Sequence, residues 1–140
     1  MDGNQVINGT YGAAFINGDR FFNVKEFEAK VSLNFEDIQL AEELGTDAKY
    51  LGYNIEGTML LHKVDDKIAR HYAEGITTGV LPDITVVTRL KDPAVAGGAE
   101  RVQLNGVKFT ELTLTKWKLE EAQEEEVPFR ARSYKYLEMI

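Results

Sequence analysis

The feature that most constrains the fold is the stretch of residues 26–36, in which polar and apolar side chains alternate strictly over eleven residues. Successive side chains of a β-strand point to opposite faces, so a period of two over this length predicts one long strand with a buried face and a wet face. The side chains expected to turn toward the subunit core are Phe27, Val31, Leu33 and Phe35. Because such a strand needs partners, the chain is predicted to be built around a β-sheet.

Turn signals divide the rest of the chain into further strands. Asn17-Gly18-Asp19 lies between two apolar stretches and predicts a hairpin. Asn105-Gly106, inside residues 100–119, is a second hairpin signal, and the apolar phase slips beyond Phe109, which predicts bulges or a strand buried in part on both faces. Other strands are expected at residues 53–64, 83–91 and about 127–137.

One helix is predicted at residues 65–77. Asp65 or Asp66 would cap its first turn, and Gly75 or Gly79 would end it. Its apolar side is expected to contain Ile68, Ala69, Tyr72, Ala73 and Ile76. A helix this short needs a sheet to lie on, so it is expected to plug one end or flank of a barrel.

Residues 41–52 are polar and mixed, and they are long for a hairpin loop in a small domain. We expect this segment to be an extended loop arm that makes contacts, and residues 1–10 to be an N-terminal arm. The predicted fold is a single, mainly β domain over residues 1–140, an antiparallel β-barrel or two-sheet sandwich with one short α-helix.

Composition excludes several classes of function. The formal net charge of −7 disfavours gripping nucleic acid or anionic lipid. The chain has no cysteine, so neither a disulfide nor a thiolate metal site is expected. No apolar stretch approaches the roughly 20 residues of a membrane helix, and the first ten residues do not read as a secretory signal. We therefore expect no membrane anchor.

Signals for catalysis or metal binding are weak. His62 and His71 match no metal-ligand spacing. Five of the seven residues 120–126 are glutamate, but they lack the ligand spacing of a calcium loop, so a solvated turn is the expectation. No nucleophile or acid–base pair stands out, and we predict no enzyme, no catalytic residue, no metal and no cofactor.

The C-terminal part of the chain, residues 98–140, contains a "GxERVxLxxVxF" segment, a glutamate-rich "EEEVPF" turn and a final aromatic strand. This order resembles the tail tube proteins of contractile-tailed phages, in particular those of defective prophages and phage-tail-like particles of Gram-positive bacteria. Residues 12–31 look like the opening hairpin of the same family. The basic, tyrosine-rich end "RARSYKY" departs from the acidic sequence that relatives often have there. The matching positions are Gly98, Glu100, Arg101, Val102, Leu104, Val107, Phe109, Glu124, Glu125, Glu126, Val127, Pro128 and Phe129.

The resemblance implies a structural protein with a fold related to phage tail tube and type VI secretion tube proteins. Its subunits would form hexameric rings that stack into a hollow tube inside a contractile sheath, and the lumen of the tube would conduct DNA or ions. The implied partners are copies of itself, the sheath protein, the baseplate, the tail terminator and a tape measure protein in the lumen, with DNA only as non-sticking cargo. The implied location is the tail of a virion or phage-tail-like particle, assembled in the cytoplasm of the bacterial host.

Within such a tube, the wet face of the long strand and of its partner is expected to form an acidic lining that repels DNA. The lumen candidates are Glu26, Glu28, Lys30, Asn34, Glu36, Asn54, Glu56 and Thr58. The candidates for contact between rings are Leu44, Tyr50 and Leu51. The candidates for a rim that meets the sheath or a neighbouring subunit are Glu124, Glu125, Glu126, Arg130, Arg132 and Tyr134.

Two alternatives remain open at this point. Phage-tail-like bacteriocins use the same parts without DNA, and the chain alone does not separate them from phages. A monomeric small-ligand β-barrel also fits alternating strands and one helix. That alternative predicts a persistent monomer with an internal apolar cavity.

Overall fold

The computed structural model describes residues 12–21, 23–42, 44–63, 67–91 and 99–139. The expected N-terminal arm, the capping residues Asp65 and Asp66 and the motif residue Gly98 lie outside these ranges. Within them the chain forms β1 (Gly12–Ile16), β2 (Asp19–Phe21), β3 (Val24–Gln39), β4 (Thr46–His62), α1 (Lys67–Thr78), β5 (Ile84–Leu90), β6 (Glu100–Phe109), β7 (Glu124–Ala131) and β8 (Ser133–Glu138).

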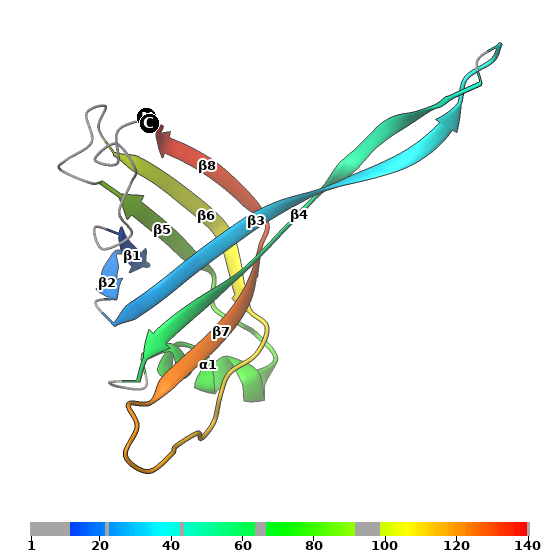
Figure 1. Ribbon diagram of the computed structural model, residues 1–140. Helices are drawn as coiled ribbons and strands as arrows, with labels where there is room; N and C mark the ends of the chain where they lie inside the picture. The colour runs from blue at the N-terminus through cyan, green and yellow to red at the C-terminus, as the bar shows by residue number, and fades with distance from the viewer. Residues whose placement is uncertain (1–11, 22, 43, 64–66, 92–98, 140) are drawn as a thin grey trace.

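The strands form one antiparallel sheet that folds over into two layers (Figure 1). Its order is β2-β1-β5-β6-β7-β4-β3, and β8 pairs with β6. Strand β6 belongs to both layers, because it pairs with β5 and β8 along most of its length and with β7 through Lys108 and Phe109. We call the part with β1, β2, β5 and β8 the β5 layer, and the part with β3, β4 and β7 the β4 layer. The prediction of a mainly antiparallel β fold with a single short helix is confirmed.

The core lies between the two layers and is closed at one end by α1. Ile16, Met59, Val107 and Val127 have no exposed surface. Tyr72 of α1 is also buried, its hydroxyl accepts a hydrogen bond of 2.9 Å from the backbone N–H of Phe109, and burial raises its pKa. The predicted helix therefore exists and caps the core.

The apolar side of α1 is narrower than expected. Ile68 and Tyr72 are buried, whereas Ile76 is 58% exposed. The helix ends where Gly79 donates its N–H to the carbonyl of Gly75 at 2.9 Å. The core therefore uses the first half of the helix, and the second half presents apolar surface at the end of the molecule.

The two turn signals have different outcomes. Asn17 and Gly18 have φ values of 49° and 87° and join β1 to β2 in the predicted two-residue hairpin. Asn105-Gly106 makes no hairpin, because β6 runs through it with a bulge opposite β5. At φ 60°, Gly106 bends the strand where it passes from one layer to the other, and an added Cβ would lie 2.9 Å from Cβ of Arg132.

The C-terminal region also differs from the prediction. Residues 110–123 form a loop and not a second strand, which explains the slip in apolar phase after Phe109. The single strand expected at 127–137 is two strands, β7 and β8, which separate at Arg132 because β7 pairs with β4 and β8 pairs with β6. The N–H of Arg132 donates to the carbonyl of Asn105 at 2.9 Å and fixes this corner.

The most prominent element is the hairpin of β3 and β4, which projects far beyond the body (Figure 1). Residues 46–52, expected in a loop arm, belong to β4, and the connection between the strands spans only residues 40–45. The expectation that Val31, Leu33 and Phe35 face the subunit core is wrong. Val31 lines a groove between the two layers and is 38% exposed, whereas Leu33 and Phe35 lie farther out, where the other layer no longer covers them.

Candidate assembly surface

The projecting hairpin has one apolar face. Its register places Leu33 opposite Tyr53 and Phe35 opposite Tyr50, and the rings of Phe35 and Tyr50 lie 5.9 Å apart. Nearer the body, Phe27 packs against Phe129 of β7 at 5.4 Å and joins the core. One face of the hairpin is therefore buried at its base and exposed toward its tip.

The apolar face continues into a groove between the two layers. Tyr134 of β8 lies 6.2 Å from Tyr53 and 6.0 Å from Tyr136, all measured between ring centroids. The groove is lined on the hairpin side by Ala29 and Val31, and on the other by residues that include Tyr134 and Tyr136. Contiguous exposed apolar surface of this kind marks a contact site.

The opposite face of the hairpin is polar. Register places Glu28 opposite Thr58 and Lys30 opposite Glu56, and every lumen candidate lies on this face. The sequence-predicted set is thus brought together: Glu26, Glu28, Lys30, Asn34, Glu36, Asn54, Glu56 and Thr58. All of these side chains are exposed.

The polar face carries mixed charge. Lys30 Nζ lies 2.9 Å from Glu28, and this hydrogen bond raises the pKa of Lys30. Arg130 of β7 lies 3.1 Å from Glu56. These residues lie opposite one another on neighbouring strands, and the register continues to β6, where Lys108 lies opposite Arg130. The sequence missed Arg130 and Lys108 as members of this face because they come from strands far along the chain.

The glutamate run behaves differently from the expected solvated turn. Glu124, Glu125 and Glu126 lie in β7 and pair with β4, and Glu125 is only 7% exposed. Glu124 accepts a hydrogen bond of 2.8 Å from Lys25, which lowers the pKa of Glu124 and raises that of Lys25. The alternation of a strand explains the difference, since it turns Glu125 inward beside Leu61.

The other rim and inter-ring candidates are scattered. Arg130 belongs to the polar face, Arg132 lies at the corner between β7 and β8, and Tyr134 borders the groove. Tyr50 lies on the apolar face of the hairpin, Leu51 is extra at the bulge in β4, and Leu44 is fully exposed at the tip. The structure therefore groups the inter-ring candidates on the hairpin but does not group the rim candidates.

Nothing in the described part of the chain resembles a metal centre, since it contains no group of three His, Cys, Asp or Glu residues able to hold an ion. In the same residues, no helix is long and apolar enough to cross a membrane.

Comparison with solved structures defines the class of fold. A chain of the sheath–tube complex of an extracellular contractile injection system, in its extended state, superposes with a TM-score of 0.75 at 9% identity, over 96% of this chain and 93% of that one. A chain of a gene transfer agent virion superposes with a TM-score of 0.64 at 11% identity, over 95% and 100%. The fold is thus shared with a protein of a contractile injection system and a protein of a gene transfer agent virion.

Sequence comparison gives the family. A family model described as phage tail tube protein matches residues 1–138. The phage-like element PBSX protein XkdM of Bacillus subtilis (strain 168) is 32% identical over 125 residues, 89% of this chain and 85% of that protein. A solved Bacillus subtilis protein is 28% identical, with a TM-score of 0.52 over 93% and 94% of the two chains. The chain belongs to the phage tail tube protein family, as its motifs predicted. Membership of this family makes it a structural subunit and not an enzyme. It also decides against the alternative of a monomeric small-ligand β-barrel.

Proposed function

We propose that this subunit assembles with copies of itself into hexameric rings that stack into a hollow tube, with the polar face of β3, β4 and β7 turned to the channel. The observation that carries the proposal is the projecting hairpin, whose apolar face is half-exposed in the isolated subunit. Leu33, Phe35 and Tyr50 are 55%, 54% and 52% exposed. A neighbouring copy is the partner that would cover them.

Unpaired strand edges support the same proposal. Strand β3 ends the strand order, and residues 46–54 of β4 pair only with β3 among the described residues. Long free edges attract other strands, and a subunit that adds its edge to its neighbour's sheet removes this hazard. Burying the exposed half of a large apolar side chain is worth about 1 kcal/mol, so Leu33, Phe35 and Tyr50 together contribute about 3 kcal/mol per contact.

The polar face suits a channel through which DNA passes without sticking. A lysine or arginine binds DNA by displacing counterions from phosphates. Lys30 and Arg130 already have carboxylate partners in Glu28 and Glu56, so they are poorly available to phosphate. The proposed lining is therefore one of paired charges, and its repulsion of DNA acts over about 8 Å at physiological salt.

We further infer that the tube works with a sheath, a baseplate, a terminator and a tape measure protein in a tail assembled in the host cytoplasm. Support comes from the fold shared with chains of a sheath–tube complex and of a sheath/tube terminator, the latter at a TM-score of 0.75. Whether the tube delivers DNA or acts as a phage-tail-like bacteriocin depends on the other parts of the particle. A capsid gene beside the gene for this chain favours a phage.

The test uses two neighbouring residues on opposite faces of β3. Leu33→Asp places a charge on the apolar face, and the matched control Ser32→Asp places it on the polar face. We expect wild type and Ser32→Asp to form rings or hollow rods in negative-stain micrographs, and Leu33→Asp to sediment as a folded monomer. Wild-type protein that stays monomeric at every concentration, or equal assembly by Leu33→Asp, contradicts the proposal.

A further inference from the structure

The end of the body opposite the hairpin tip carries a second exposed apolar surface, formed by residues 110–123 below α1 (Figure 1). Leu114, Trp117 and Leu119 in this loop are 91%, 73% and 80% exposed. Lys116 and Lys118 flank the tryptophan. We call residues 114–119 the Trp117 loop.

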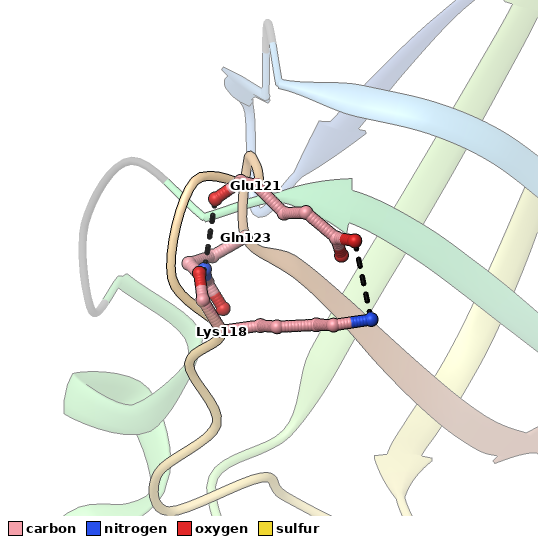
Figure 2. Close-up of polar contacts among 3 residues, drawn as sticks. All are labelled: Lys118, Glu121 and Gln123. Carbon is pink, nitrogen blue, oxygen red and sulfur yellow. Dashed lines mark hydrogen bonds and ion pairs between the residues drawn. The ribbon is translucent and has the colours of Figure 1, made fainter.

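Residues 118–123, the second half of the loop of residues 110–123, are held in shape by their own side chains (Figure 2). Gln123 Nε2 donates to the carbonyls of Lys118 and Glu121, both at 2.9 Å, and Lys118 Nζ lies 3.2 Å from Glu121. Glu120 completes the turn at φ 63°. These contacts order residues 118–123, which directly follow Trp117. A segment that is ordered before binding loses less conformational entropy when it binds, so this turn is a preformed support next to the exposed tryptophan.

The hairpin tip carries exposed leucines and carboxylates that suit the exposed apolar side chains of the Trp117 loop and the lysine before Trp117. Residues 36–49 contain five acidic residues and one lysine. Leu40 and Leu44 are exposed among them, Leu44 completely. The leucines of the tip match the exposed Leu114, Trp117 and Leu119, and Lys116 is the lysine beside Trp117 that tip carboxylates would meet, because Lys118 is already paired with Glu121.

The two surfaces cannot meet within one subunit because they lie at opposite ends of the molecule (Figure 1). Beyond the last pairing of β4 with β7, residues 32–39 of β3 extend the hairpin by about 25 Å at about 3.3 Å per residue. A head-to-tail contact between unlike ends of two copies closes into a ring only if its rotation fits, and otherwise it repeats along an axis. The hairpin is therefore long enough to extend past its own subunit and contact another copy.

We propose that the hairpin tip of one copy docks on the Trp117 loop of a copy in the adjacent ring, with Leu44 against Trp117 and tip carboxylates near Lys116. This contact rests on the proposed tube function and specifies how its rings are joined. It assigns the Trp117 loop to a second copy and not to the sheath.

Trp117 is the sole tryptophan of the sequence, so its fluorescence reports directly on this contact. We expect iodide quenching of wild-type emission to fall about fivefold on assembly, because the side chain passes from largely exposed to buried at the centre of a contact. Sedimentation of the same samples measures assembly independently. Leu44→Asp is expected to leave Trp117 quenchable and to stop assembly at single rings, and Thr77→Asp on α1 is the matched control that changes neither.

Cysteine pairing identifies the occupant, because the chain has no cysteine of its own. A chain carrying Leu44→Cys and Leu119→Cys should form a ladder of disulfide-linked oligomers when assembled tubes are oxidised, and each single variant should form none. Tubes in which Trp117 stays as quenchable as in the monomer, or is protected only after sheath protein is added, overturn this inference and leave the proposed function intact. Absence of rings and tubes altogether refutes the proposed function, and the docking contact with it.

Discussion

Gly57 lies in the part of β4 that pairs with β3 on one side and with β7 on the other. A Cβ at this position would meet the carbonyl oxygen of Glu28, the Phe129 ring at 2.5 Å and Cα of Ala29 at 3.0 Å. The ring of Phe129 cannot retreat freely, because Phe27 packs against it at 5.4 Å. Gly57→Ala therefore forces β3 and β7 apart.

Overpacking of this kind costs about 3 kcal/mol, since both a backbone and a buried ring must shift. For a chain of this length that corresponds to a fall in Tm of about 10 °C. The assay is urea unfolding of the monomer, followed by far-UV circular dichroism. A matched control is Gly45→Ala at the hairpin turn, where an added Cβ meets nothing within 4 Å. If Gly57→Ala unfolds within about 0.5 kcal/mol of Gly45→Ala, the packing around Gly57 is looser than the contacts imply.

Three further predictions test the core and the polar face. Tyr72→Phe leaves the buried N–H of Phe109 without its acceptor and should lower the free energy of unfolding by about 1–2 kcal/mol, measured by the same urea titration; no change would show that water replaces the hydroxyl. The hydrogen bond from Lys25 holds the pKa of Glu124 below its ordinary value of 4.5. The bond therefore stabilises the fold above pH 4.5, and this stabilisation is lost as the pH falls through the pKa of the folded protein. Carboxyl NMR should show a low titration midpoint for Glu124 that Lys25→Met raises, and an unmoved midpoint would exclude Lys25 as the cause. Changing Glu28 and Glu56 together to lysine removes the carboxylate partners of Lys30 and Arg130 and leaves these cations available to phosphate. A DNA-carrying phage with both changes should assemble normal tails but deliver its genome poorly, whereas a Glu74→Lys control on α1 should deliver it normally. Undiminished delivery by the double variant contradicts an electrostatic role for the lining.

The parts of the fold that were predictable from the sequence are those with local signals. Strict alternation identified β3, and Asn17-Gly18 identified the first hairpin. The same alternation sorted the polar side chains of β3 and β4 onto one face, because side-chain parity is a property of the strand alone.

The failures have physical causes in tertiary structure. Residues 46–52 lack a clean alternation because Leu51 is an extra residue at a bulge, which shifts the phase of β4 between Tyr50 and Gly52. Asn105-Gly106 bends a strand between two layers, and its dipeptide alone does not distinguish that corner from a hairpin turn. The pairing of Glu56 with Arg130 joins residues 74 positions apart, which no local pattern reveals.

The distal hairpin also has a consequence for the timing of polymerisation. A two-stranded ribbon with no third strand beside it is marginally stable in water. Its amide hydrogens should therefore exchange rapidly in newly synthesised subunits and become protected only after incorporation. Each arriving subunit must order this ribbon as it binds, which slows the first encounters and makes growth from an existing end faster than spontaneous initiation.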